Sequence, residues 1–239
     1  TLNGGSVYSD ATSTKQEDVN IGYFGRLNYD YLKRYMLTAT FREDGSSRFA
    51  KGNQWGFFPG LSVGWVMSDE PFMQNIGFIS NLKWRGSYGQ IGYYDALGLY
   101  AITTSYDQSA ATVSSAMPNK ALEWETSTQL DLGFDLGLFK NRIILGIDYF
   151  NKITDNLITS KVLPNTSGYG SILTNLGKVR FRGFDAEITT RNIVKKDFTW
   201  ESKFTITYVK NKVLKLPENG RDKNRQGGYS VKMQDGTTK

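Results

Sequence analysis

The stretch that decides the fold is DLGFDLGLFKNRIILGIDYF, residues 131–150. It contains two runs in which a large apolar residue stands at every second position. The first run is Leu132, Phe134 and Leu136, and the second is Ile143, Leu145, Ile147 and Tyr149. Successive side chains of a strand point to opposite faces, so this stretch predicts two antiparallel strands joined by a tight turn at 138–141. One face of the first strand is apolar, and the other carries only glycines and carboxylates.

The same alternation recurs along the chain and predicts about eight strands in four hairpins. They fall near 19–29, 35–42, 57–67, 82–88, 124–136, 143–149, 173–190 and 198–208. The predicted short connections are 30–34, 138–141 and 191–197, and the long ones are 43–56, 92–119 and 155–172. A further strand-like run lies near 99–106 within the second long connection.

Long strands with a two-residue repeat, joined alternately by short and long connections, are typical of a large antiparallel transmembrane β-barrel. We therefore expect an all-β fold with short periplasmic turns and long extracellular loops. The apolar face would contact lipid, and the polar face would line a lumen. Aromatic residues near strand ends are expected in the two interfacial girdles, namely Tyr29, Trp65, Trp84, Trp124, Tyr149 and Trp200.

The composition narrows the classes of function. The 239 residues contain no Cys and no His, which removes the commonest metal ligands and the commonest general base. Mean hydropathy is −0.43, and no run approaches the roughly 18 apolar residues of a membrane helix. The net charge of +6 is spread over turns, so a nucleic-acid partner is not expected. No catalytic residue, metal or cofactor is predicted.

The segment NKALEWETSTQLDLGFDLGLFKNRIILGIDYFNKITDNLI, residues 119–158, resembles a hallmark of the SusC/RagA-type TonB-dependent transporters of Bacteroidetes outer membranes. That family's hairpin has the form L-x-W-E-T-T-x-Q-x-D-x-G-x-D. Ser127 replaces the second Thr, and the remaining positions are filled by Leu122, Trp124, Glu125, Thr126, Gln129, Asp131, Gly133 and Asp135.

Three further stretches are similar to motifs of the same family. FREDGSSRFAKGNQWGFFPGLSVGWVMSDEPFM covers 41–73, LKWRGSYGQIG covers 82–92, and NLGKVRFRGFDAEI covers 175–188. In the last motif Asp185 stands where the family usually has Glu, and Glu187 follows two positions later.

The resemblance implies a C-terminal fragment with about eight strands of a barrel of about 22. Residues 1–18 would be an incoming extracellular loop, 19–210 the strands, and 211–239 a further extracellular loop where the chain is cut before the barrel closes. The family's plug, its TonB-contacting segment and its closing strand would then lie outside this chain. The expected location is the outer membrane of a Gram-negative bacterium.

For function, the resemblance implies TonB-dependent uptake of a large nutrient together with a SusD-type surface lipoprotein that acts as a lid. An oligosaccharide is favoured as substrate, and a peptide comes next. Aromatic rings beside a carboxylate suit sugar faces and hydroxyls. The predicted contact residues are therefore Tyr93, Tyr94, Asp95 and Tyr100, with Trp55 from the preceding long loop.

Two other functions remain open from the residues alone. A soluble β-rich binding or adhesion domain would also show alternating strands. An outer-membrane β-barrel enzyme would need an acid/base pair such as Glu123 and Glu125, which lie two positions apart on one strand face. A Ser-His nucleophile is impossible within a sequence that lacks His.

Overall fold

In the computed structural model, residues 17–99, 101–103, 106–107, 112–113 and 115–215 are described. Strands dominate these described residues, and the two helical elements among them are single 3₁₀ turns. The elements are β1 (Asn20–Tyr31), β2 (Tyr35–Ser46), β3 (Trp55–Val66), η1 (Met67–Asp69), β4 (Ile79–Tyr93), β5 (Tyr106–Asp107), β6 (Thr112–Val113), β7 (Ala116–Met117), β8 (Glu125–Leu138), β9 (Ile143–Val162), η2 (Asn165–Ser167), β10 (Ser171–Val194) and β11 (Thr199–Lys215).

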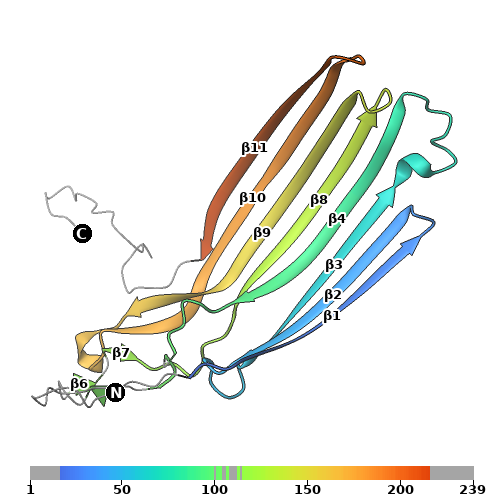
Figure 1. Cartoon of the computed structure of the whole chain (residues 1–239). Helices are drawn as coiled ribbons and strands as arrows, with labels where there is room; N and C mark the ends of the chain where they lie inside the picture. Colours follow the sequence, from blue (N-terminus) through green and yellow to red (C-terminus); the bar gives the residue numbers. More distant parts are fainter. Residues whose placement is uncertain (1–16, 100, 104–105, 108–111, 114, 216–239) are drawn as a thin grey trace, which may run out of the picture.

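Eight long strands form one antiparallel meander in the order β1-β2-β3-β4-β8-β9-β10-β11 (Figure 1). Each long strand pairs with the long strand that follows it in the sequence. The short β7 adds a two-residue parallel pairing to the loop end of β10, and β5 and β6 pair with each other. The predicted all-β fold with about eight long strands is confirmed.

The connections lie at two opposite ends of the meander, as Figure 1 shows. The end that carries η1 holds the tight turns 32–34, 139–142 and 195–198 together with the segment 67–78. The other end, where β6 and β7 lie, holds the connections 47–54 and 163–170 and the described residues of 94–124. We call these the turn end and the loop end.

The tight turns are formed without glycine. Leu32 and Lys33 adopt φ of 54° and 56°, in the left-handed region that non-glycine residues rarely occupy. Asp30 stabilises this turn, because its Oδ1 accepts a hydrogen bond of 2.8 Å from the Lys33 backbone N–H. The turn after β8 uses the same region, with φ of 57° at Lys140 and 59° at Asn141.

Several sequence predictions about where strands lie were wrong. β11 continues to Lys215, five residues into the loop predicted at 211–239. The connection expected at 155–172 is shorter, because β9 continues to Val162 and β10 begins at Ser171. The adjacent Leu157 and Ile158 point to opposite faces there, so the alternation that marks a half-apolar strand disappears although backbone pairing continues. The run near 99–106 does not form a strand; its described residues are turns as far as 103, and the strand β5 begins only at Tyr106.

Every second side chain of a strand points to the same side of the sheet, and we call such a set of positions one parity. Side chains of one parity give the sheet a continuous apolar face. Phe134 lies opposite Trp84 on β4 and Ile147 on β9, and Ile147 lies opposite Ala186 on β10. No described layer covers this face, so that Leu132 is 52% exposed and Phe204 63%. Large apolar groups exposed in this number indicate a surface that contacts lipid.

The opposite parity gives the polar face, with Arg, Asp, Gln, Ser and Thr side chains on neighbouring strands. Within the described residues, no helix has the length and apolarity needed to cross a membrane.

Candidate functional site

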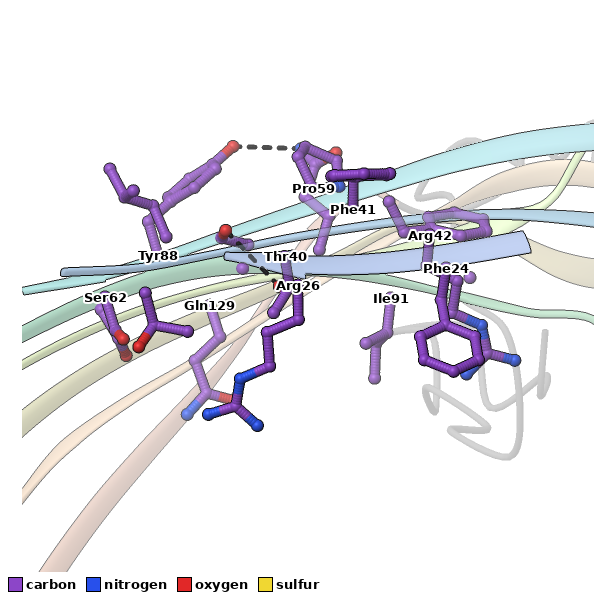
Figure 2. Close-up of a pocket in the computed structure, with 18 of the residues that line it drawn as sticks. Phe24, Arg26, Thr40, Phe41, Arg42, Pro59, Ser62, Tyr88, Ile91 and Gln129 are labelled. Atoms are coloured by element: carbon purple, nitrogen blue, oxygen red, sulfur yellow. Dashed lines mark hydrogen bonds between the residues drawn. The ribbon is translucent and has the colours of Figure 1, made fainter. Parts of the chain in front are cut away.

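Residues of β1–β4, β8 and β9 line a hollow of about 930 Å³, and side chains from both faces of the sheet take part in its lining. Figure 2 shows that Arg26, Gln129 and Ile91 extend to one side of the strands, whereas Tyr88 and Phe41 extend to the other. Hydrogen-bonding side chains supply most of the lining on the polar side, namely Arg26, Thr38, Thr40, Arg42, Asp44, Ser62, Ser87, Gln129, Asp131 and Lys152.

Several of these groups are already paired, either along one strand or, for Ser87 and Asp131, between neighbouring strands. The Arg42 Nε donates to Asp44 Oδ1 over 2.8 Å. Asp131 accepts from Gln129 Nε2 at 2.8 Å and from Ser87 Oγ at 3.0 Å. Such fixed donors and acceptors form a polar surface that a hydrated solute can exchange hydrogen bonds with.

Nearer the turn end, one arginine joins three strands on the polar face. Arg85 of β4 donates from Nε and Nη2 to both carboxylate oxygens of Asp135 on β8, at 2.9 and 3.0 Å. Its Nη2 also contacts Asp148 of β9 at 3.0 Å. A bidentate guanidinium–carboxylate pair is strong and geometrically specific, so Arg85 fixes the relative register of these strands.

At the loop end the long connections share a small apolar core. Phe49, Leu97 and Leu122 are 0–1% exposed, and Phe58, Trp124 and Ile158 complete the cluster. Trp124 packs against Phe49 with ring centroids 4.9 Å apart, and its Nε1 donates to the Gln54 carbonyl at 3.3 Å. The prediction that Trp124 lies in a girdle was therefore wrong, because the chain leaves the sheet just before β8 and turns this ring into the loop core.

Arg48 ties this loop cluster to the segment that precedes β1. It donates to Asp18 Oδ2 from Nε at 3.0 Å and from Nη2 at 2.7 Å, and from Nη1 to the Leu97 carbonyl at 2.9 Å. Its guanidinium also lies 5.3 Å from the centre of the Tyr94 ring. The hydrogen bond from Arg48 holds the pKa of Asp18 below its usual value, and the pKa of Arg48 is raised in return.

The structure brings three of the predicted contact residues together and separates a fourth. Tyr93 ends β4 on the parity of the polar face, is 51% exposed and lies near the carboxylate of Asp95. Tyr94 is packed into the loop core, where its hydroxyl donates to Asn20 Oδ1 at 2.8 Å. Trp55 lies on the apolar face and stacks on Tyr23 at 6.0 Å. Tyr100 lies outside the described residues.

The carboxylates considered for an enzyme have separate partners. Glu125 is 6% exposed, and its Oε1 accepts a 2.6 Å hydrogen bond from the Ile158 backbone N–H. Glu123 instead faces Asn156, whose Nδ2 lies 3.5 Å from its Oε2. Glu125 therefore holds the β9 backbone at the loop end.

Sequence reasoning did not single out Arg26, Gln129 and Asp131 as a shared surface. Their strand parity was a usable signal, because residues of one parity on paired strands face the same side. The convergence of Arg85 on two aspartates 50 and 63 positions away depends on strand register, which one sequence does not display.

Comparison with known proteins agrees with this architecture. The family described as "TonB dependent receptor-like, beta-barrel" matches residues 1–232. TonB-dependent receptor P3 of Formosa agariphila is 39% identical over 226 residues, which are 91% of this chain and 22% of that protein. TonB-dependent receptor SusC of Bacteroides thetaiotaomicron is 36% identical over 220 residues, or 87% of this chain and 22% of that protein.

Among solved structures, that of the RagAB peptide transporter superimposes with a TM-score of 0.73 at 25% identity, covering 85% of this chain and 23% of that one. The siderophore receptor PirA from Pseudomonas aeruginosa shares the fold alone, with a TM-score of 0.55 at 18% identity. The chain thus spans only about a fifth of its curated relatives, at 20–22% of their length. It belongs to the TonB-dependent receptor-like β-barrel family and is a barrel segment of the SusC and RagA type.

Proposed function

We propose that this chain is part of the wall of an outer-membrane channel that takes up a large nutrient with energy supplied through TonB. The observation that carries the proposal is the pairing of a continuous apolar face with a polar face on the same long strands. A lipid-facing surface and a hydrated lumen both follow from that arrangement. The chain contributes wall and loops, and the parts that gate the channel and contact TonB would belong to the rest of the receptor.

For the substrate, we favour an oligosaccharide that contacts the loop end of the polar face. Tyr93 supports this choice, because it combines an exposed ring with the neighbouring carboxylate of Asp95. The ring can cover the apolar face of a sugar while the carboxylate accepts hydroxyl hydrogen bonds. A peptide is the second candidate, supported by the likeness to the RagAB peptide transporter.

For the partner, we propose a SusD-type surface lipoprotein that closes over the loop end. The packed core of Phe49, Leu97 and Leu122 supports this proposal, because it gives the loops a fixed surface for a lid to contact. Affinity purification of the intact receptor in mild detergent should recover such a lipoprotein. Recovery of the folded receptor alone would count against it.

The substrate assignment is tested by what co-purifies with the intact receptor. Mass spectrometry should find glycans, and the amount should fall in a Tyr93→Ala variant. Peptides without glycan would reverse the order of the two candidates.

Tyr94→Ala is the matched comparison for Tyr93→Ala. Since Tyr94 packs inside the loop core, its removal should loosen the loops and increase their proteolysis, whereas Tyr93→Ala should leave proteolysis unchanged. Equal loss of binding in both variants together with equal loop damage would mean that Tyr93 has only a structural role.

A further inference from the structure

Four cationic side chains lie close together on β10 and β11. They occupy strand positions whose side chains point to the same side as the apolar face. Arg182 lies directly opposite Lys210, and Arg180 lies directly opposite Lys212. Opposite residues have Cβ atoms roughly 5 Å apart, and same-face neighbours along a strand are roughly 7 Å apart. We call this group the β10–β11 cation cluster.

The cluster lies just beyond an aromatic row. Phe184 and Tyr208 pair across the two strands with ring centroids 5.8 Å apart, and Tyr149 of β9 lies opposite Phe184. From this row the apolar face continues toward the turn end, whereas the cations lie on its loop-end side. Aromatic girdles mark the membrane interfaces of such barrels. The cations are therefore at head-group level on the loop side of the membrane.

In the described part of the chain, no carboxylate pairs with any of the four. Their neighbours on β9 are neutral, since Asn151 lies opposite Arg182 and Ile153 opposite Arg180. Asp155, two positions further along β9, is ion-paired with Lys178 instead.

Cations on the polar face of the same two strands do have carboxylate partners. Lys203 lies 2.7 Å from Glu187, and Arg191 lies 3.3 Å from Glu201. Like charges directly opposite each other destabilise a sheet. An anion that lies between the four side chains would offset this repulsion.

We propose that the β10–β11 cation cluster binds the phosphate-bearing head group of an outer-leaflet lipid. A guanidinium recognises phosphate through paired hydrogen bonds, and the neighbouring ammonium groups add point charges. The acyl chains then lie along the apolar face below, against Phe184 and Tyr208. The proposal rests on the outer-membrane placement of the barrel and is independent of the transported substrate.

The test uses the intact receptor and lipid A, a glycolipid with two phosphates, added to micelles of a neutral detergent. Lipid retained after gel filtration is quantified by mass spectrometry. The cluster variant carries Arg180→Gln, Arg182→Gln, Lys210→Gln and Lys212→Gln. A matched control removes four cations at the turn end, through Lys140→Gln, Arg142→Gln, Lys195→Gln and Lys196→Gln.

We expect the receptor and the control variant to retain lipid A equally, and the cluster variant to bind it roughly fivefold more weakly for each cation removed. Equal retention by the cluster variant would overturn the proposal. So would equal retention of dephosphorylated lipid A, or displacement of lipid A by inorganic phosphate at the concentration of the lipid.

Two further variants guard against a folding defect in the cluster variant. Lys210→Arg with Lys212→Arg keeps the charge and should retain lipid A, whereas Lys210→Gln with Lys212→Gln should lose it in part. Failure of either expectation in a receptor with heat-modifiable, folded migration would contradict the proposal. A structure of the complete receptor in which carboxylates from beyond residue 215 pair with all four cations would do the same.

Discussion

Trp84 of β4 lies directly opposite Phe134 of β8, and their ring centroids are 5.4 Å apart on the apolar face. Trp65 of β3 lies opposite Trp84 on its other side. Three aromatic side chains thus follow one another across three strands of a surface that no described layer covers. Such a row stabilises strand pairing and at the same time suits contact with lipid.

The first prediction is that Trp84 and Phe134 are energetically coupled. A double-mutant cycle with Trp84→Leu and Phe134→Leu should give a favourable coupling of about 0.2–1 kcal/mol, measured by urea unfolding of the intact receptor in lipid vesicles. Trp84→Leu combined with the distant Phe204→Leu should be additive. Additivity of the first pair would show that the two rings do not stabilise each other.

The second prediction concerns a charge placed on each face of β8. Leu132→Arg would put a cation into hydrocarbon and should reduce the unfolding free energy by about 2–4 kcal/mol. Gln129→Arg adds the same side chain to the polar face, where water solvates it, and should change that free energy by less than about 1 kcal/mol. Urea titration of the vesicle-bound receptor measures both, and equal losses would refute the assignment of the faces.

The third prediction is a pH dependence that originates at Glu70, in the segment between η1 and β4. Its Oε1 accepts hydrogen bonds from Tyr35 Oη at 2.5 Å and Trp65 Nε1 at 3.1 Å. These hydrogen bonds, the one from Tyr35 first, lower the pKa of Glu70 below its usual value. The Arg34 guanidinium, 3.5 Å away, acts in the same direction.

The folded state therefore favours the charged form of Glu70. Its stabilisation of the fold is complete above the unfolded-state pKa of about 4.3, and it is lost as the pH falls through the lower folded-state pKa. The deficit of a Glu70→Gln variant should therefore be largest at neutral pH and shrink in acid. Unfolding free energies of variant and parent across that range measure it. A deficit for Glu70→Gln that is constant with pH would contradict the account.

The fourth prediction is the topology of the connections. The chain has no Cys, so within it each introduced cysteine reports one position. Lys120→Cys at the loop end should react with a membrane-impermeant maleimide on whole cells, and Lys140→Cys at the turn end should react only after the outer membrane is opened. The reverse pattern would invert the assignment.

The sequence was sufficient to predict the strands, their antiparallel order and the division into apolar and polar faces. The reason is that a half-apolar strand repeats every two residues, as Leu132, Phe134 and Leu136 do. The prediction was least accurate where this repeat ends. Residues 155–162 continue β9 with apolar and polar side chains mixed on both faces, so backbone pairing persists without an alternating sequence signal.

The site was less predictable because it depends on which loops meet. Tyr93 stays a predicted contact residue, whereas neighbouring Tyr94 is part of a core that also contains Phe49 and Trp124. Trp124 continues the two-residue repeat of the lipid-facing residues in the sequence. It lies just outside β8, however, and its ring packs into the loop core instead of facing lipid.

The most direct test of the central claim, that the sheet is a transmembrane barrel wall, is a spin-label scan of residues 129–136 in the intact receptor reconstituted in lipid vesicles. Each position is replaced by cysteine in turn, and the labels are exposed to oxygen, which partitions into lipid, and to a water-soluble relaxation agent. The account predicts that labels at even positions, including Leu132 and Phe134, respond to oxygen, and that labels at odd positions, including Asp131 and Asp135, respond to the aqueous agent. Accessibility without a two-residue period, or even positions that respond mainly to the aqueous agent, would contradict it.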